Sequence, residues 1–81
     1  MTREEIRESV IKALREIAPE IEPSRIKPDL SMRDQLDIDS VDFLNFIIGL
    51  HKAFNVEIPE TDYPSLYSLD GCINYFAERV R

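Results

Sequence analysis

The 81-residue sequence has one cysteine, one histidine, two glycines and no tryptophan. Cys72 has no second cysteine to pair with, and no CxxC or histidine-rich segment surrounds it, so we expect neither an internal disulfide nor a metal site. The two glycines, Gly49 and Gly71, stand far apart, which excludes a glycine-rich phosphate-binding loop.

Long hydrophobic runs are also absent. No apolar stretch approaches the roughly 20 residues that are needed to span a bilayer. The N-terminus reads Thr2-Arg3-Glu4-Glu5, which is unlike the basic and then apolar start of a signal peptide. We therefore expect no membrane insertion and a cytoplasmic location.

Basic residues are scarce in the middle of the chain. Between Asp29 and Asp62 there are eight acidic residues and two basic ones, Arg33 and Lys52, so this segment alone carries the net charge of −6 of the whole chain. Such a segment repels nucleic-acid phosphates and favours partners with basic patches. The alternative interpretation is a loop region that is kept polar for solubility.

The length and composition are those of one folded domain. Residues 1–81 fit a single small domain, and the 43% hydrophobic and 32% charged residues are typical of a globular chain. Thr2 and Glu5 have the spacing of a capping box, which predicts that a first helix begins there. Apolar residues then recur every three or four positions until Pro19 ends the pattern.

Two further long helices are predicted. The clearest runs from about Ser40 to Phe54, and its apolar stripe includes Leu44 and Ile48, so we expect contacts on more than one side. Ser68 can cap a last helix. Between these two, a brief helix near Glu60 to Tyr63 is predicted to stop before Pro64.

The connection from Glu20 to Asp39 shows neither helical nor strand periodicity. We expect a long loop that includes a short helical turn near Met32 to Gln35. Isolated apolar residues should anchor this loop to the core: Ile21, Ile26, Leu30, Met32, Leu36 and Ile38. The pattern as a whole predicts an all-α fold, a small irregular four-helix bundle with three main helices, one short helix and a long first loop.

No catalytic constellation is apparent. His51 follows Ser40 by eleven residues on the same predicted helix, which places the two roughly 16 Å apart. A serine–histidine nucleophile therefore cannot form within one chain, and we expect a protein that is not an enzyme. A serine at a helix start is by itself most often only a cap.

The segment around this serine resembles the acyl carrier protein family. The family's modification motif is Asp-Ser-Leu at the start of the second helix, where this chain has Asp39-Ser40-Val41. The similarity extends without a gap through the helix and its Phe-x-x-x-Ile-Pro ending, at Asp42, Leu50, Phe54, Ile58 and Pro59. It covers nearly the whole chain.

The resemblance implies a monomeric carrier. Ser40 would receive 4'-phosphopantetheine from coenzyme A through a magnesium-dependent phosphopantetheinyl transferase. An acyl ligase or synthase would then load the thiol of this arm, in fatty-acid, lipid or polyketide-type biosynthesis. Two alternatives stay open, which are a carrier of aminoacyl or peptidyl groups and an unmodified helical adaptor in which Ser40 is only a cap.

The chain departs from the family pattern in two respects. Asp37 stands where the family commonly has glycine, and Val41 stands where it commonly has leucine. The helix from Ser40 to Phe54 carries only Asp42 against Lys52, although relatives use acids there to attract basic partner enzymes. This predicts a specialised carrier whose partners recognise the motif and the helix surface through Asp39, Val41, Asp42, Asn45, His51 and Lys52.

Four other residues have ordinary structural explanations. Cys72 falls on the apolar face of the last helix, where an inert packed thiol is expected. Tyr63, Tyr67 and Tyr75 lie in or after the predicted short helix. Amphipathic packing accounts for them, and the border of an acyl pocket is the alternative.

Overall fold

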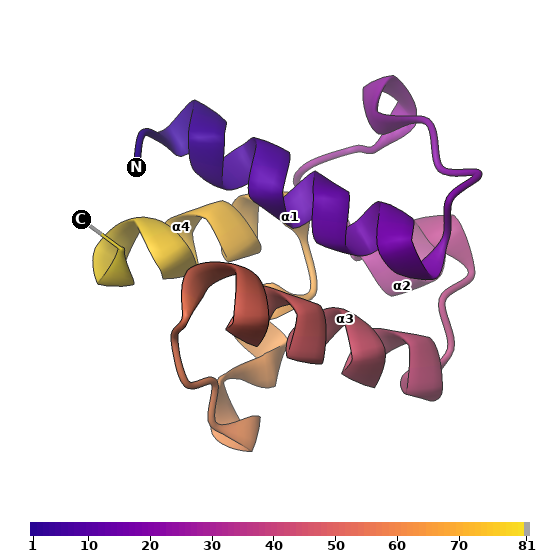
Figure 1. Cartoon of the computed structure of the whole chain (residues 1–81). Helices are drawn as coiled ribbons and strands as arrows, with labels where there is room; N and C mark the ends of the chain where they lie inside the picture. The colour runs from indigo at the N-terminus through magenta and orange to yellow at the C-terminus, as the bar shows by residue number, and fades with distance from the viewer. Residues whose placement is uncertain (81) are drawn as a thin grey trace.

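The computed structural model describes residues 1–80, which form helices joined by loops (Figure 1). Its elements in order are α1 (Arg3–Ile17), the 3₁₀ helix η1 (Pro23–Arg25), α2 (Met32–Leu36), α3 (Ser40–Phe54), the 3₁₀ helix η2 (Glu60–Leu66) and α4 (Leu69–Arg79). Within residues 1–80 there is no strand, only an isolated bridge between Ser31 and Ser68. The predicted all-α fold of three main helices and a short one is confirmed.

The helix starts follow the capping signals of the sequence. The Thr2 hydroxyl accepts a hydrogen bond from the Glu5 N–H at 3.1 Å, and the Glu5 carboxylate accepts one from the Thr2 N–H at 2.8 Å. The Ser68 hydroxyl accepts from the Gly71 N–H at 3.0 Å and caps α4. Both predicted starts are confirmed because these bonds satisfy N–H groups that have no partner within their helices.

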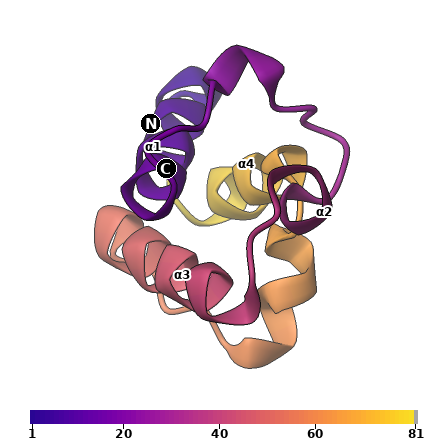
Figure 2. The same cartoon turned by 90° about the vertical axis from the view of Figure 1, so that its right-hand side faces the viewer.

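The core lies between α1, α3 and α4. It contains the buried side chains of Phe46, Leu50 and Phe54 from α3 and of Ile73 and Phe76 from α4. The Phe54 and Phe76 rings stack with centroids 4.1 Å apart and join α3 to α4. Figure 2 views the bundle from the end at which α2 and the first turn of α3 lie.

The first connection is more ordered than predicted, since it contains both η1 and α2. Polar contacts fasten it. The Gln35 side chain accepts from the Lys27 N–H at 2.9 Å and donates to the Lys27 and Leu30 carbonyls at 2.8 and 3.2 Å. The expectation that Leu30 anchors the loop to the core is wrong, because Leu30 is 47% exposed. Its backbone carbonyl instead accepts a hydrogen bond from Gln35.

The element after α3 is also longer than predicted. η2 continues through Pro64 to Leu66, because the φ angle that proline imposes suits a 3₁₀ helix even though proline blocks an α-helix. α4 then packs closely against it. A Cβ atom at Gly71 would overlap the carbonyl oxygen of Ser65, so the glycine permits this close approach.

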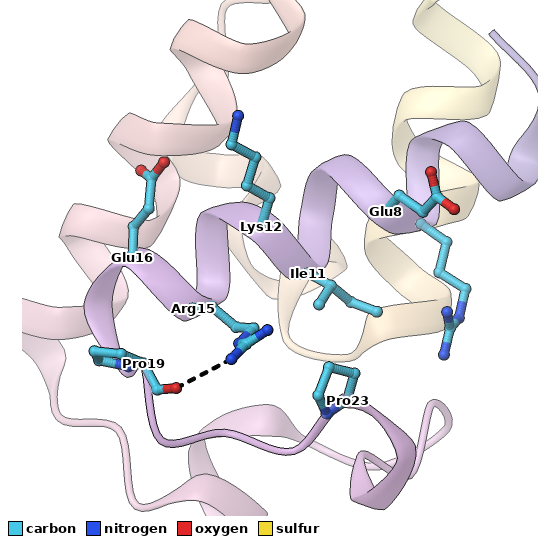
Figure 3. A pocket seen from close by; sticks show the side chains of 8 residues that line it. Glu8, Ile11, Lys12, Arg15, Glu16, Pro19 and Pro23 are labelled. Atoms are coloured by element: carbon cyan, nitrogen blue, oxygen red, sulfur yellow. Dashed lines mark hydrogen bonds between the residues drawn. The ribbon is translucent and has the colours of Figure 1, made fainter.

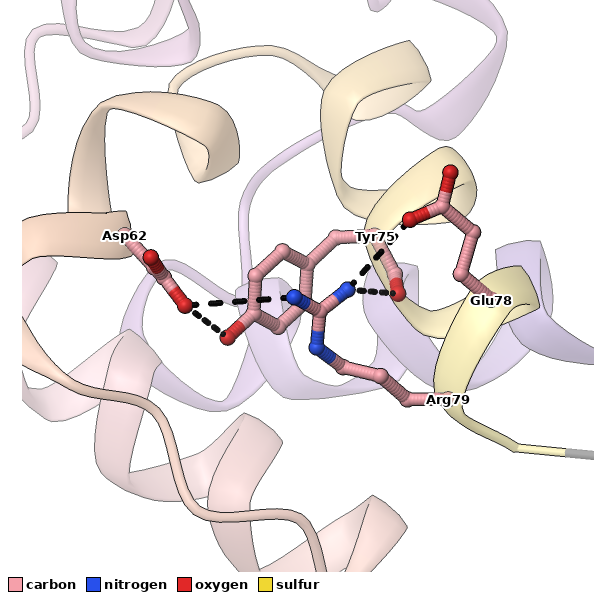
Figure 4. Close-up of polar contacts among 4 residues, drawn as sticks. All are labelled: Asp62, Tyr75, Glu78 and Arg79. Carbon is pink, nitrogen blue, oxygen red and sulfur yellow. Dashed lines mark hydrogen bonds and ion pairs between the residues drawn. The ribbon is translucent and has the colours of Figure 1, made fainter.

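A polar cluster joins η2 to the end of α4 (Figure 4). The buried Tyr75 donates a hydrogen bond from its hydroxyl to the Asp62 carboxylate at 2.7 Å. The Arg79 guanidinium lies 3.6 Å from the centroid of the Tyr75 ring and 3.9 Å from the same carboxylate. Burial raises the pKa of the Tyr75 hydroxyl, and the hydrogen bond to Asp62 raises it further.

We expect Tyr75→Phe to lower the free energy of unfolding by about 1–2 kcal/mol at neutral pH, because Asp62 loses a charge-assisted hydrogen bond. The raised pKa means that the folded protein holds this proton more tightly than the unfolded chain, whose tyrosines titrate near about 10. The contribution is therefore complete below about pH 10 and is lost as the pH rises through the folded pKa. Urea denaturation of both proteins should show the difference shrinking at high pH, and a constant difference would contradict this explanation.

Candidate functional site

Ser40 is the first residue of α3, and its side chain is exposed to solvent. The cap of the helix is Asp39, whose carboxylate accepts a hydrogen bond from the Asp42 N–H at 2.8 Å. The interpretation of Ser40 as the cap is therefore wrong, because the aspartate before it already provides the capping oxygen. The serine hydroxyl is left outside the helix hydrogen-bond network.

One side chain of α2 contacts this hydroxyl. Arg33 donates a hydrogen bond from Nη2 to Ser40 Oγ at 3.1 Å. The sequence prediction did not include Arg33 in the site. The only signal for it was that Arg33 is one of the two bases in the acidic segment between Asp29 and Asp62, and periodicity does not show that α2 turns this side chain toward α3.

The turn between α2 and α3 contains a residue with a left-handed backbone conformation. Asp37 ends α2 with φ 53° and ψ 46°, in the region that glycine occupies most readily and that aspartate and asparagine tolerate. The family's glycine at this place is thus explained by the backbone, and Asp37 keeps the same turn. Only Ile38 separates Asp37 from the Asp39 cap, and its side chain is buried.

The outer face of α3 carries an exposed apolar row. Val41, Leu44 and Ile48 are 68%, 48% and 47% exposed. We expected contacts on more than one side of this helix, but residues 1–80 leave about half of Leu44 and Ile48 uncovered. Asn45 and Lys52, which are also exposed, share this side of the helix at spacings of three and four. Asp42 in the first turn is the one acidic residue of α3.

His51 is exposed, as expected, but its ring also makes a local contact. Nδ1 lies 2.8 Å from the carbonyl oxygen of Val56, and because a carbonyl only accepts, the bond requires a proton on Nδ1. This bond ties the last turn of α3 to the chain after Asn55, which ends the helix in the left-handed region with φ 53°. His51 is therefore partly a structural residue.

A groove between α3 and η2 opens beside His51. It is lined by Ile47, Ile48, Ile58 and Tyr63 together with His51, Glu57 and Pro59. Tyr63 thus borders a groove, whereas the Tyr67 ring packs edge-on against Phe43 with centroids 5.4 Å apart. Tyr75 belongs to the cluster with Asp62. Tyr63 is therefore the tyrosine that borders the groove beside α3.

A second groove runs along α1 beside η1 (Figure 3). It is lined by Arg7, Lys12 and Arg15 but also by Glu8 and Glu16, so charges of both signs alternate around it. Arg15 donates to the Pro19 carbonyl at 3.5 Å at its edge. None of the lining residues belongs to the motif or to α3.

Cys72 is fully buried, and its thiol donates to the Leu66 carbonyl at 3.4 Å. Burial raises the pKa of this thiol strongly, so it stays protonated and unreactive near neutral pH. The expectation of an inert packed cysteine is confirmed.

No three histidine, cysteine or acidic side chains of residues 1–80 gather where a metal ion could bind. No helix within that range has the length and apolar character to cross a membrane.

The cap assignment predicts unequal effects at neighbouring positions of the apo protein. Asp39→Ala should lower the free energy of unfolding by about 1 kcal/mol, because the Asp42 N–H loses its acceptor. Ser40→Ala should change it by less than about 0.5 kcal/mol, because it removes only one exposed hydrogen bond. Urea denaturation of the two variants measures both, and a larger loss for Ser40→Ala would contradict the assignment.

Comparisons with known proteins agree on one family. Residues 5–71 match the family described as the phosphopantetheine attachment site. An acyl carrier protein of Rubrobacter xylanophilus is 28% identical over 75 residues, which cover 89% of this chain and 93% of the relative. One of Lactobacillus johnsonii is 32% identical and covers 93% of this chain and 92% of its own length.

A meromycolate extension acyl carrier protein of Mycobacterium leprae is also 32% identical, over 93% of this chain and 64% of that protein. Among solved structures, an acyl carrier protein from Enterococcus faecalis matches with a TM-score of 0.74 and 26% identity, over 96% of this chain and 98% of that one. The chain belongs to the acyl carrier protein family, whose members are carriers that hold acyl groups on covalently attached 4'-phosphopantetheine.

Proposed function

We propose that Ser40 is the residue to which 4'-phosphopantetheine is attached. The observation that carries the proposal is an exposed serine hydroxyl on the first turn of α3 that the helix does not use as a cap. By contrast, Ser31 and Ser68 use their hydroxyls to cap α2 and α4. Asp39 before Ser40 completes the motif and offers the transferase a charge to recognise.

In the attachment reaction, Ser40 Oγ attacks the phosphorus of coenzyme A that bears the pantetheine. The new O–P bond forms as the bond to adenosine 3',5'-bisphosphate breaks, and the serine proton passes to a base of the transferase. When bound, the arm supplies a thiol that carries the acyl group as a thioester. The N–H groups and the dipole at the start of α3 favour the negative phosphodiester, while Asp39 and Asp42 oppose it.

We place residues 1–81 in one carrier domain that works as a monomer in the cytoplasm. A phosphopantetheinyl transferase modifies it, and an acyl ligase or synthase then loads it. Catalysis rests with these partners. The single histidine is engaged with the Val56 carbonyl at the far end of α3, so it is not placed to take a proton from Ser40.

The test of attachment is intact mass after incubation with coenzyme A and a broad-specificity transferase. The wild type should gain one phosphopantetheinyl group, Ser40→Ala should gain none, and the control Ser24→Ala should gain one because Ser24 lies outside the motif. Ser40→Ala should still fold, because Asp39 and not Ser40 caps α3. The absence of a mass gain in this variant would therefore not result from unfolding. A mass gain in Ser40→Ala would place the arm elsewhere, and no gain in the wild type would favour an unmodified adaptor.

We further propose that this carrier is specialised and that its partners dock mainly through apolar contact with α3. The support is the exposed row of Val41, Leu44 and Ile48. It lies beside Lys52 and beside Asn45, a position where the family resemblance implies an acid. Asp42 and Lys52 leave α3 neutral, so the attraction of a basic partner surface is weak at the point of contact. Acids before and after α3 still act over the screening length of about 8 Å.

Adding acids to α3 should therefore improve use by a general fatty-acid synthase whose carrier-binding surface is basic. The variant is Asn45→Glu with Lys52→Glu, and it leaves His51 unchanged because that ring bonds to Val56. Ser24→Glu with Arg25→Glu makes the same charge change on η1 and serves as the control. Elongation rates of the modified proteins should rise about tenfold for the α3 variant only, and equal rates would show that partner choice does not depend on the charge of α3.

A further inference from the structure

We propose that Arg33 binds the phosphodiester of the arm on Ser40 and holds the base of the arm against the first turn of α3. The inference rests on the proposed attachment at Ser40. Its starting point is the hydrogen bond from Arg33 Nη2 to Ser40 Oγ at 3.1 Å. Because the phosphorus bonds directly to Oγ, a guanidinium that reaches this oxygen also reaches the oxygens of the phosphate.

The Arg33 side chain is held in place by contacts that do not involve Ser40. Nε donates to the Ile38 carbonyl at 3.4 Å, and the guanidinium carbon lies 5.7 Å from the centroid of the Phe43 ring, within range of a cation–π contact. The side chain is partly buried. Ordering it toward the phosphate therefore costs less conformational entropy than ordering a freely moving arginine.

The backbone that carries Arg33 is fastened as well. The Met32 N–H donates to the Tyr67 carbonyl at 2.7 Å, which links the start of α2 to the end of η2. At the other end of α2, the Arg33 carbonyl accepts from the N–H of Ile38 at 3.3 Å. α2 thus presents the guanidinium from a supported position, even though the helix has only five residues.

No carboxylate of the described residues forms an ion pair with Arg33. Both ion pairs within residues 1–80 belong to Arg79, although Asp34, Asp37 and Asp39 are close to Arg33 in sequence. A phosphodiester would introduce an anion directly at this guanidinium. Guanidinium–phosphate hydrogen bonds are charge-assisted, and the planar fork of donors on arginine fits two phosphate oxygens at once.

Arg33 also offsets the negative charge of the carboxylates around Ser40. Asp39 and Asp42 stand beside Ser40 and repel a phosphodiester, while the start of α3 offsets this only through backbone N–H groups and the helix dipole. A cation supplied from α2 adds the missing attraction. The phosphate would then lie between two helices, which restricts the directions in which the arm leaves the protein.

The experiment compares apo and modified forms of four proteins: the wild type, Arg33→Gln, Arg33→Lys and the control Arg25→Gln. Arg25 is an exposed arginine on η1, so its variant makes the same charge change away from Ser40. Intact mass after incubation with coenzyme A and transferase first establishes that each protein carries one arm. Absence of the mass gain in the wild type would refute attachment at Ser40, which is a different failure from that of the role of Arg33.

Two readouts then isolate the phosphate contact. For each protein, the change in unfolding midpoint on attachment is the midpoint of the modified form minus that of the apo form. This change should be about 2–5 °C more positive in the wild type than in Arg33→Gln. Arg33→Lys should fall between them, and Arg25→Gln should match the wild type. A purely structural Arg33 would shift the apo and modified forms equally. This difference between the two proteins should decrease at about 1 M salt. The ³¹P NMR resonance of the arm should move in Arg33→Gln and in Arg33→Lys but not in Arg25→Gln.

An equal change on attachment in the wild type and Arg33→Gln, with an unmoved ³¹P resonance, would overturn the proposal. If Arg33→Gln does not fold, the decision passes to Arg33→Lys and to the salt dependence of the wild type. The proposal then requires a ³¹P resonance in Arg33→Lys that differs from the wild type. It also requires a midpoint change on attachment that depends on salt, and the absence of either result would overturn it.

Discussion

The short turn between α2 and α3 is the constraint on which the site depends. Asp37 reverses the chain in the left-handed region, Ile38 enters the core, and Asp39 caps the next helix. Three residues thus end one helix and begin another, so side chains of both helices meet at Ser40. A longer turn would separate Arg33 from the serine, and an uncapped start would leave the first N–H groups of α3 unsatisfied.

The small size of the chain explains why one face of α3 is buried and the other is exposed. One face supplies Phe46, Leu50 and Phe54 to the core, and a chain of this length builds only one such core. The opposite face therefore remains outside, with its apolar row exposed. A helix that contributes to stability on one side and to partner contact on the other tolerates changes on the outer side far better than on the inner one.

Much of this fold could be predicted from the sequence because local rules decide it. The Thr2–Glu5 box, the Ser68 cap and the spacing of core residues in α3 and α4 involve neighbours within a turn or two. The contacts that could not be predicted are side-chain bonds across longer separations, such as Gln35 to Lys27 and Arg33 to Ser40. Hydrophobic periodicity contains no information about them. Ser40 is proposed as the attachment residue from its motif, whereas the cap assignment required the backbone geometry at Asp39.

The burial of Cys72 has a practical chemical consequence. It is the only cysteine of the sequence, and its thiol is enclosed and protonated in the folded protein. A carrier that bears the arm would then expose a single nucleophilic sulfur, which is the one that holds the cargo. Thiol-specific reagents applied under native conditions would distinguish empty arms from loaded ones without interference from the polypeptide, and the cargo thioester would have no internal thiol to which it could be lost.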